Sequence, residues 1–153
     1  MKKLLIFVTV AAAALAVIQP TIARVDAQAG PQMKAKPTLT VRSTQFGRIL
    51  FDGRGQALYA FTRDRRGAPS TCYGDCAEAW PVYFRQAPLT AGNGVKASLI
   101  GTTRRKDGRL QVTYNGRPLY SYAHEGLGEV KCQNVFGFGG LWLVARPDGT
   151  LVR

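Results

Sequence analysis

The chain has 153 residues, 46% of them hydrophobic, and its 21 lysines and arginines outnumber 9 acidic residues to give a formal net charge of +12. This length suits one domain around a single hydrophobic core and excludes an array of several full-size domains. The basic balance favours anionic partners such as membrane surfaces, cell-wall polymers or nucleic acid.

The N-terminal residues have the pattern of a secretory signal peptide. Two lysines precede an uncharged apolar run from Leu4 to Ile18, and Ala27-Gln28-Ala29 is a small-x-small cleavage site. Thr21-Ile22-Ala23 is a second candidate for cleavage, and an uncleaved anchor helix is the alternative. The apolar run is shorter than the about 20 residues of a membrane span. We therefore expect a periplasmic or secreted protein that does not span the membrane once processed.

The predicted boundaries are a signal peptide over 1–29, a polar leader over 30–37 and a folded body over 38–153. Removal of the signal peptide leaves a net charge of about +10. Small basic clusters occur at Arg63 to Arg66 and at Arg104 to Lys106, where solvated loops are the simpler interpretation. Because an exported protein rarely meets nucleic acid, we expect anionic envelope components rather than nucleic acid as partners.

Short β-prone segments dominate the first half of the body. Thr38 to Ser43 alternates like a strand, and two further runs, Arg48 to Phe51 and Ala57 to Thr62, flank the turn residues Asp52 to Gly55. These two runs predict a β-hairpin with a glycine-containing loop. Farther on, Asp75 is placed to cap one turn of helix that Pro81 would end.

The second half has clearer signals. Residues 86–100 read as a connection, after which Leu110 to Tyr114 and Arg117 to Tyr122 flank Asn115-Gly116, a strong hairpin signal. Pro118 belongs near a strand start or a sheet edge. The apolar run Leu141 to Val144 predicts a buried strand, followed by a last turn and Leu151-Val152.

One stretch of the chain occurs twice with an offset of 61 residues, so that Gly47 aligns with Gly108 and Leu58-Tyr59 with Leu119-Tyr120. A repeat of this kind indicates two supersecondary units that bury their apolar faces against each other. We expect repeat one at about 45–84 and repeat two at about 106–153. With frequent glycine and no long helical periodicity, the predicted fold is mainly β: a single small domain of two pseudo-symmetric antiparallel hairpin repeats with short helical turns.

The repeat carries a motif of two aromatic residues and an acid. Tyr59, Phe61 and Asp64 in the first copy recur as Tyr120, Tyr122 and Glu125 in the second. On a strand, residues two apart share a face, so each copy presents two rings side by side. One interpretation is a pair of sites for a small ligand. The other, which we favour, is a core in which the rings pair across the pseudo-twofold axis and the acids close loops.

The chain has three cysteines, Cys72, Cys76 and Cys132, and three disulfide pairings are open. An exported protein favours a disulfide. A Cys72–Cys132 bridge would stabilise by roughly 4 kcal/mol and a Cys72–Cys76 bridge by about 2. Proximity favours the Cys72–Cys76 pair, which we expect. The alternative is a copper-handling or thiol-redox site of Cys72, Cys76 and His124, because sulfur ligands select Cu(I).

Sequence motifs for catalysis are missing. The chain has no Gly-x-Ser-x-Gly, His-Glu-x-x-His, phosphate-binding loop or Cys-x-x-Cys-His, and His124 is its single histidine. We therefore expect no enzyme, no catalytic residues and, outside the copper alternative, no cofactor or metal.

At these residues the chain resembles a bacterial secreted-repeat family of unknown function, described as predicted lipoproteins with a Tyr-x-(Phe/Trp/Tyr)-x-x-Asp motif. The resemblance implies an exported two-repeat protein without an established activity or ligand. Glu125 departs from the motif aspartate, Cys132 lies outside the pattern, and no cysteine near the cleavage site can carry a lipid. The matching segments are Gly47 to Asp64, Cys72 to Pro81, Asp107 to Tyr120, Gly139 to Trp142 and Pro147 to Gly149.

The function predicted from sequence is that of an exported non-enzymatic envelope or periplasmic protein that binds or scaffolds. The alternatives are the copper or thiol-redox protein described above and a basic module that adheres to anionic cell-surface polymers.

Overall fold

The computed structural model describes residues 36–84 and 88–153, and the structural statements below refer to this part of the chain. The predicted signal peptide and residues 30–35 of the predicted leader lie outside the described residues. Among the residues described, no helix has the length and apolar character needed to cross a membrane.

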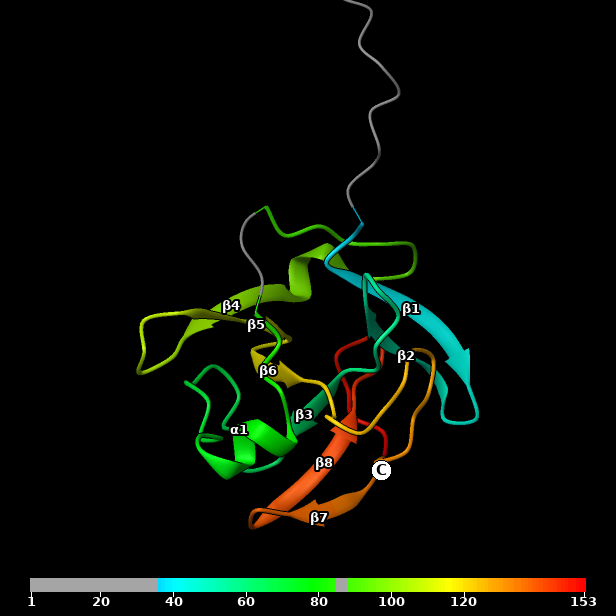
Figure 1. Cartoon of the computed structure of the whole chain (residues 1–153). Coiled ribbons are helices and arrows are strands. Elements are labelled where there is room, and N and C mark those ends of the chain that lie inside the picture. The colour runs from blue at the N-terminus through cyan, green and yellow to red at the C-terminus, as the bar shows by residue number, and fades with distance from the viewer. Residues whose placement is uncertain (1–35, 85–87) are drawn as a thin grey trace, which may run out of the picture. The chain divides into compact units, whose positions relative to one another are not determined.

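The described chain is mainly β, as the sequence predicts. Strands β1 and β2 form a two-stranded sheet, and the other strands form a six-stranded antiparallel sheet in the order β4-β5-β6-β3-β8-β7 (Figure 1). The elements are β1 Leu39–Thr44, β2 Gly47–Asp52, β3 Tyr59–Phe61, α1 Asp75–Ala79, the 3-10 helix η1 Ala97–Leu99, β4 Ile100–Arg104, β5 Leu110–Tyr114, β6 Arg117–Tyr120, β7 Val135–Gly137 and β8 Gly140–Val144.

The hairpin expected around Asn115-Gly116 is present. Tyr114 of β5 pairs with Arg117 of β6, and the two turn residues have φ values of 49° and 72°. Left-handed backbone at both positions is what a two-residue hairpin turn requires, and Asn-Gly adopts it at low cost. Pro118 is the second residue of β6, near the strand start as expected, but β6 lies between β5 and β3 rather than at an edge.

The first hairpin differs from the prediction. Strand β2 pairs along its whole length with β1, and it meets the following segment at one bridge, Phe51 to Ala57. The reason lies in the turn, where the Asp52 carboxylate accepts hydrogen bonds from the backbone N–H groups of residues 54, 55 and 56. This closes a wider loop, and β3 leaves β2 to pair with β6 and β8 in the six-stranded sheet.

Strand β4 was not predicted. It begins at Ile100, within the stretch that reads as a connection, and pairs with β5 over five residues. Its side chains alternate between partly buried and exposed without an apolar pattern, which leaves little local signal for a strand. At the 61-residue offset β4 corresponds to β1, so each copy contributes an antiparallel hairpin and a following strand.

The short helix α1 is present, but its predicted cap is wrong. Gly74 occupies the N-cap position with a φ of 54°, and Asp75 is the first helical residue. No side chain caps the start of the helix. The left-handed backbone at Gly74, which glycine adopts readily, turns the chain into the helix.

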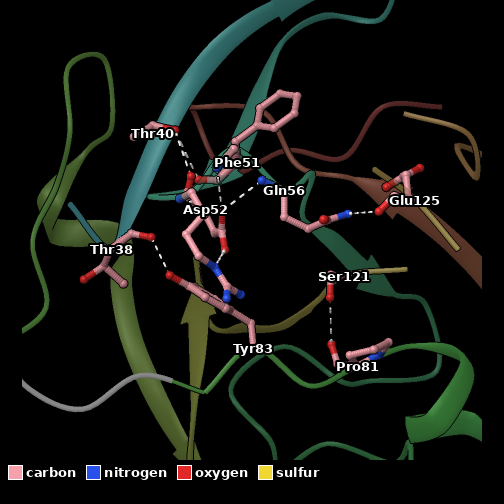
Figure 2. A network of polar contacts seen from close by, with 11 residues as sticks. Thr38, Thr40, Phe51, Asp52, Gln56, Pro81, Tyr83, Ser121 and Glu125 are labelled. Carbon is pink, nitrogen blue, oxygen red and sulfur yellow. Dashed lines mark hydrogen bonds and ion pairs between the residues drawn. The ribbon is translucent and has the colours of Figure 1, made fainter. Parts of the chain in front are cut away.

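Two hydrophobic clusters fill the interior. One gathers the aromatic rings of β3, β6 and β8 with Trp80 and the Cys72–Cys76 segment. The other draws on β1, β2, β5 and β6 and on residues next to β3 and β8: Leu39, Leu50, Leu58, Val112, Tyr114, Leu119 and Ala145. The hydroxyl of Tyr83 donates a hydrogen bond of 2.6 Å to the Thr38 carbonyl, and this bond ties the 81–84 segment to the residue before β1 (Figure 2).

Candidate functional site

The repeated motif lies at the centre of the six-stranded sheet. Tyr59 of β3 is directly opposite Tyr120 of β6 in the antiparallel register, and these two residues are equivalent at the 61-residue offset. The pairing of equivalent residues places the pseudo-twofold axis between them. Both tyrosine side chains are fully buried, and so is Phe61, whereas Tyr122 is half-buried.

Each tyrosine binds the acid of the other repeat. The Tyr59 hydroxyl donates to Glu125 Oε1 at 2.6 Å, and the Tyr120 hydroxyl donates to Asp64 Oδ2 at 2.5 Å. The motif residues of one copy are therefore hydrogen-bonded to those of the other. They form a crossed pair of hydrogen bonds between the copies, an arrangement that sequence spacing alone does not reveal.

The two acids also bind the loops that follow the strands. Asp64 Oδ1 accepts hydrogen bonds from the backbone N–H and the hydroxyl of Thr71, both at 2.7 Å. Glu125 Oε1 accepts from the backbone N–H of Lys131, and the side-chain amide of Gln56 donates to the Glu125 carbonyl at 3.1 Å (Figure 2). Both carboxylates are buried, and Glu125 Oε2 is buried without a hydrogen-bond partner.

The burial of the tyrosines controls their protonation. Burial raises the pKa of Tyr59 well above its usual value, and the hydrogen bond to Glu125 and its charge raise that pKa further. The pKa of Tyr120 is raised in the same way, first by burial and then by the charge of Asp64. Both phenols therefore remain protonated donors at any pH at which the protein works.

The aromatic rings also cross between repeats. Trp80 and Trp142 stack face to face with ring centroids 3.9 Å apart, Phe61 stacks on the outer face of Trp142 at 4.2 Å, and Tyr122 lies against Trp80 at 4.9 Å. Tyr59 meets Trp80 edge-on at 5.2 Å, as Tyr120 meets Trp142 at 5.1 Å. Such stacked and edge-on contacts add to the stability that burial provides.

A buried arginine adjoins this centre. Arg105 is 5% exposed, and its guanidinium donates to Ser70 Oγ at 2.7 Å, to Gln111 Oε1 at 2.9 Å and to the Cys72 carbonyl at 2.7 Å. Sequence analysis placed Arg105 in a solvated loop cluster, which is wrong, because the fold encloses it beneath the ring of Tyr73 at 4.1 Å.

Ser70 connects the arginine to the crossed pair. Tyr120 gives its hydrogen to Asp64, so the contact of 2.5 Å between the two hydroxyls leaves Ser70 as donor to Tyr120. A chain of hydrogen bonds therefore runs from Arg105 through Ser70 and Tyr120 to Asp64. Two buried groups of opposite charge are thus linked through hydroxyls rather than by direct contact. The remaining guanidinium nitrogen, Arg105 Nε, is buried without a hydrogen-bond partner.

The Cys72–Cys76 disulfide that the sequence favours is present. Cys132 is free and half-buried, and its backbone N–H donates to the Tyr59 hydroxyl at 3.3 Å. Burial raises the pKa of the Cys132 thiol, and the charge of Glu125 raises it further. Sequence alone left the role of Cys132 open; the fold uses its backbone at the crossed pair.

In the structure, the two cysteines proposed as copper ligands form a disulfide, and the proposed histidine ligand is exposed. Cys72 and Cys76 are joined to each other, so neither sulfur is a thiolate, and His124 is exposed with its ring edge-on to Tyr122 at 5.5 Å. Over residues 36–84 and 88–153, no three His, Cys, Asp or Glu side chains gather as metal ligands. A copper site at these residues would need the reduced form of the pair.

Two hollows on the surface are lined by residues outside the repeated motif. One of about 610 Å³ runs beside Arg66 and along β4 and β5, and one of about 310 Å³ lies between Pro37, Asp52 and Tyr83. The six motif residues line neither of them. The chemistry that the motif supports in this geometry is internal: hydrogen bonding and stacking between the two repeats.

A family model described as a secreted repeat of unknown function matches the chain twice, over residues 40–83 and 101–146. The matches begin in β1 and in β4 and are offset by 61 residues, the same offset that relates Tyr59 to Tyr120. Comparisons with curated proteins and with solved structures give no match.

Proposed function

The chain belongs to this family of secreted repeats of unknown function, and from that premise we propose that it is a non-enzymatic protein of the bacterial envelope or periplasm that binds or scaffolds through its outer surface. The observation that carries the proposal is the crossed pair of tyrosine–acid hydrogen bonds. A general acid or base has to reach a substrate, whereas Asp64 and Glu125 are buried and bound to Tyr120 and Tyr59. The residues most suggestive of chemistry thus hold the repeats together.

The distribution of charge supports a binding role. Among the described residues, three of eight acidic side chains are buried, namely Asp52, Asp64 and Glu125, against one of sixteen basic ones, Arg105. Folding therefore leaves a surface that is more basic than the composition alone suggests. A surface of this kind attracts anionic envelope components through long-range electrostatics. This favours adhesion to anionic polymers as the second candidate function.

The test is binding of the mature protein to dextran sulfate, with uncharged dextran as the matched control. We expect binding to the sulfated polymer alone, falling as salt rises from 50 to 500 mM because ions screen exposed charges. The variant Arg65→Glu with Lys106→Glu, two exposed positions, should weaken the binding. Equal retention on both polymers, or none on either, would contradict the proposal.

A copper-handling or thiol-redox role of Cys72, Cys76 and His124 is the alternative: copper binding requires both sulfurs as free thiols, and a redox role requires a Cys72–Cys76 disulfide that is readily reduced. The native mass of the protein, purified from the exported fraction without reductant or added metal, separates the two. A mass two hydrogens below the reduced chain with nothing bound excludes copper at this pair, and resistance of the disulfide to reduction excludes the redox role and supports the scaffold proposal. A mass that includes one copper ion, with unpaired thiols, favours the alternative.

A further inference from the structure

Large exposed hydrophobic side chains gather on one hairpin. Of those in the described chain, Val135, Phe136 and Phe138 lie on β7 and the turn that joins it to β8, and Phe136 is 72% exposed. Strand β7 is the edge of the six-stranded sheet, and the turn projects at the bottom of Figure 1. A cluster of exposed apolar side chains indicates a contact surface more strongly than single ones do.

The turn itself carries backbone strain. Gly137 pairs with Gly140, and the two residues between them, Phe138 and Gly139, have φ values of 54° and 82°. The turn after β5 has the same left-handed geometry and fills it with Asn115-Gly116. A bulky residue is disfavoured at the first of these positions, where asparagine is favoured. The local fold therefore does not account for phenylalanine at residue 138, and its side chain is 44% exposed.

A positive charge is fixed to this apolar turn. The Arg63 guanidinium donates to the Phe138 carbonyl at 2.9 Å and lies beside Gly139. The strand after the turn packs closely against the segment that carries Arg63, because a Cβ atom at Gly140 would come within 3.0 Å of side-chain atoms of Phe61, Thr62 and Arg63. Two exposed aromatic side chains and an exposed guanidinium thus lie at one tip of the fold.

We propose that the β7–β8 hairpin is a membrane-contact element that places Phe136 and Phe138 in the interfacial region of an anionic bilayer while Arg63 meets the lipid phosphates. This rests on the proposed function and names its anionic partner as a lipid surface. Apolar side chains beside cations are the composition that binds at such interfaces. A second copy of the chain is a poorer occupant, because two strongly basic surfaces repel each other.

The experiment is co-sedimentation of the mature protein with vesicles of phosphatidylglycerol and phosphatidylcholine, and with vesicles of phosphatidylcholine alone. The variant Phe136→Ser with Phe138→Asn should lower partitioning into the anionic vesicles by about tenfold or more, since two buried rings are lost from the interface. Arg63→Gln should weaken binding to anionic vesicles and leave the weak binding to neutral vesicles unchanged. The matched control is Leu127→Ser, an apolar side chain that is 66% exposed on another loop, which should bind as the wild type does.

Phe138→Asn separates loss of contact from loss of folding. Because asparagine suits the left-handed position, this variant should unfold at a higher temperature than the wild type while it binds vesicles less well. A fall in both quantities, unchanged vesicle binding in the double variant, or an equal loss in Leu127→Ser would overturn the proposal. So would a wild-type dimer that the double variant converts to a monomer without any vesicle binding, because the hairpin would then be an interface between copies.

Binding to dextran sulfate distinguishes failure of the membrane proposal from failure of the proposed function. The double variant retains its basic residues and should bind the polymer as the wild type does. Unchanged polymer binding with lost vesicle binding supports both proposals, and polymer binding with hairpin-independent vesicle binding overturns the membrane contact alone.

Discussion

Tyr59 and Glu125 lie 66 positions apart in the chain, and the tyrosine hydroxyl donates a hydrogen bond of 2.6 Å to the glutamate carboxylate. The equivalent bond of the other copy joins Tyr120 to Asp64. Within one motif the tyrosine and the acid are five residues apart, but each is hydrogen-bonded to a residue of the other motif. The second copy has glutamate where the first has aspartate, and this conservative difference keeps a carboxylate acceptor for Tyr59.

Double-mutant cycles should follow the crossed pairs. We expect Tyr59→Phe and Glu125→Leu each to cost about 1–3 kcal/mol of unfolding free energy, because each removes one member of the hydrogen bond and leaves the other buried and unsatisfied. Their coupling energy should be about 1 kcal/mol or more, and that of Tyr59→Phe with Asp64→Asn, which lie within one motif, within about 0.5 kcal/mol of zero. Urea unfolding measures both. Stronger coupling within a motif than between motifs would refute the crossed arrangement.

Alkaline pH should destabilise the protein through the same tyrosines. In the unfolded chain both phenols have a pKa of 10.0, and burial beside an acid raises the pKa of each in the folded protein. The folded state therefore holds these protons more tightly, so the associated stability is complete below pH 10 and is lost as pH rises above it. The loss approaches about 1.4 kcal/mol per pH unit for each phenol.

Urea unfolding at pH 8, 10 and 11 checks this pH dependence. Tyr59→Phe with Tyr120→Phe removes both phenols, and this variant should lose less stability between pH 10 and 11 than the wild type. An identical loss in the two proteins would show that other groups cause it.

Reduction of the Cys72–Cys76 disulfide should lower the unfolding free energy by about 2 kcal/mol on the chain-entropy model, since the bridge closes a short loop with a sequence separation of 4. Part of this loss should come from a weaker hydrogen bond between the Arg105 guanidinium and the Cys72 carbonyl. Thermal unfolding with and without a phosphine reductant measures the difference. Cys72→Ser with Cys76→Ser should reproduce it and Cys132→Ser, the control at the free cysteine, should not; an unchanged melting temperature would contradict the expectation.

Arg105→Lys should destabilise far more than the same change at its neighbour. A lysine carries one ammonium on a flexible stem and cannot reproduce the three donor contacts of the planar guanidinium, so we expect a cost of about 2–4 kcal/mol. Arg104 is exposed, and Arg104→Lys should stay within about 0.5 kcal/mol of the wild type. Chemical denaturation of the two variants decides between a structural and a solvated role for Arg105; equal effects would mean that its burial contributes little.

The features that sequence predicts are those that adjacent residues determine. Asn115-Gly116 specifies its own turn, Leu141 to Val144 carries the apolar run of a central strand, and Cys72 and Cys76 are close enough to pair without any help from the rest of the fold. The 61-residue offset predicts the two-repeat design, which the family match confirms.

The contacts that sequence misses depend on partners far along the chain. Spacing by two shows that Tyr59 and Phe61 share a strand face, but it does not show that the strand opposite belongs to the other copy. Arg105 lies among exposed basic residues, and its enclosure follows only from the approach of Ser70 and Gln111. Strand β4 had one available signal, because the 61-residue offset maps the strand at 39–44 onto residues 100–105.

The stacked pair of Trp80 and Trp142 brings one indole from each half of the molecule to a common point. Each half supplies an indole, a phenol and a carboxylate, and each must receive the same three groups from the other. A polypeptide severed between the halves would therefore yield complementary fragments, neither of which is complete alone. In this respect the chain is a twofold-symmetric dimer encoded as one polypeptide, and its assembly does not depend on protein concentration.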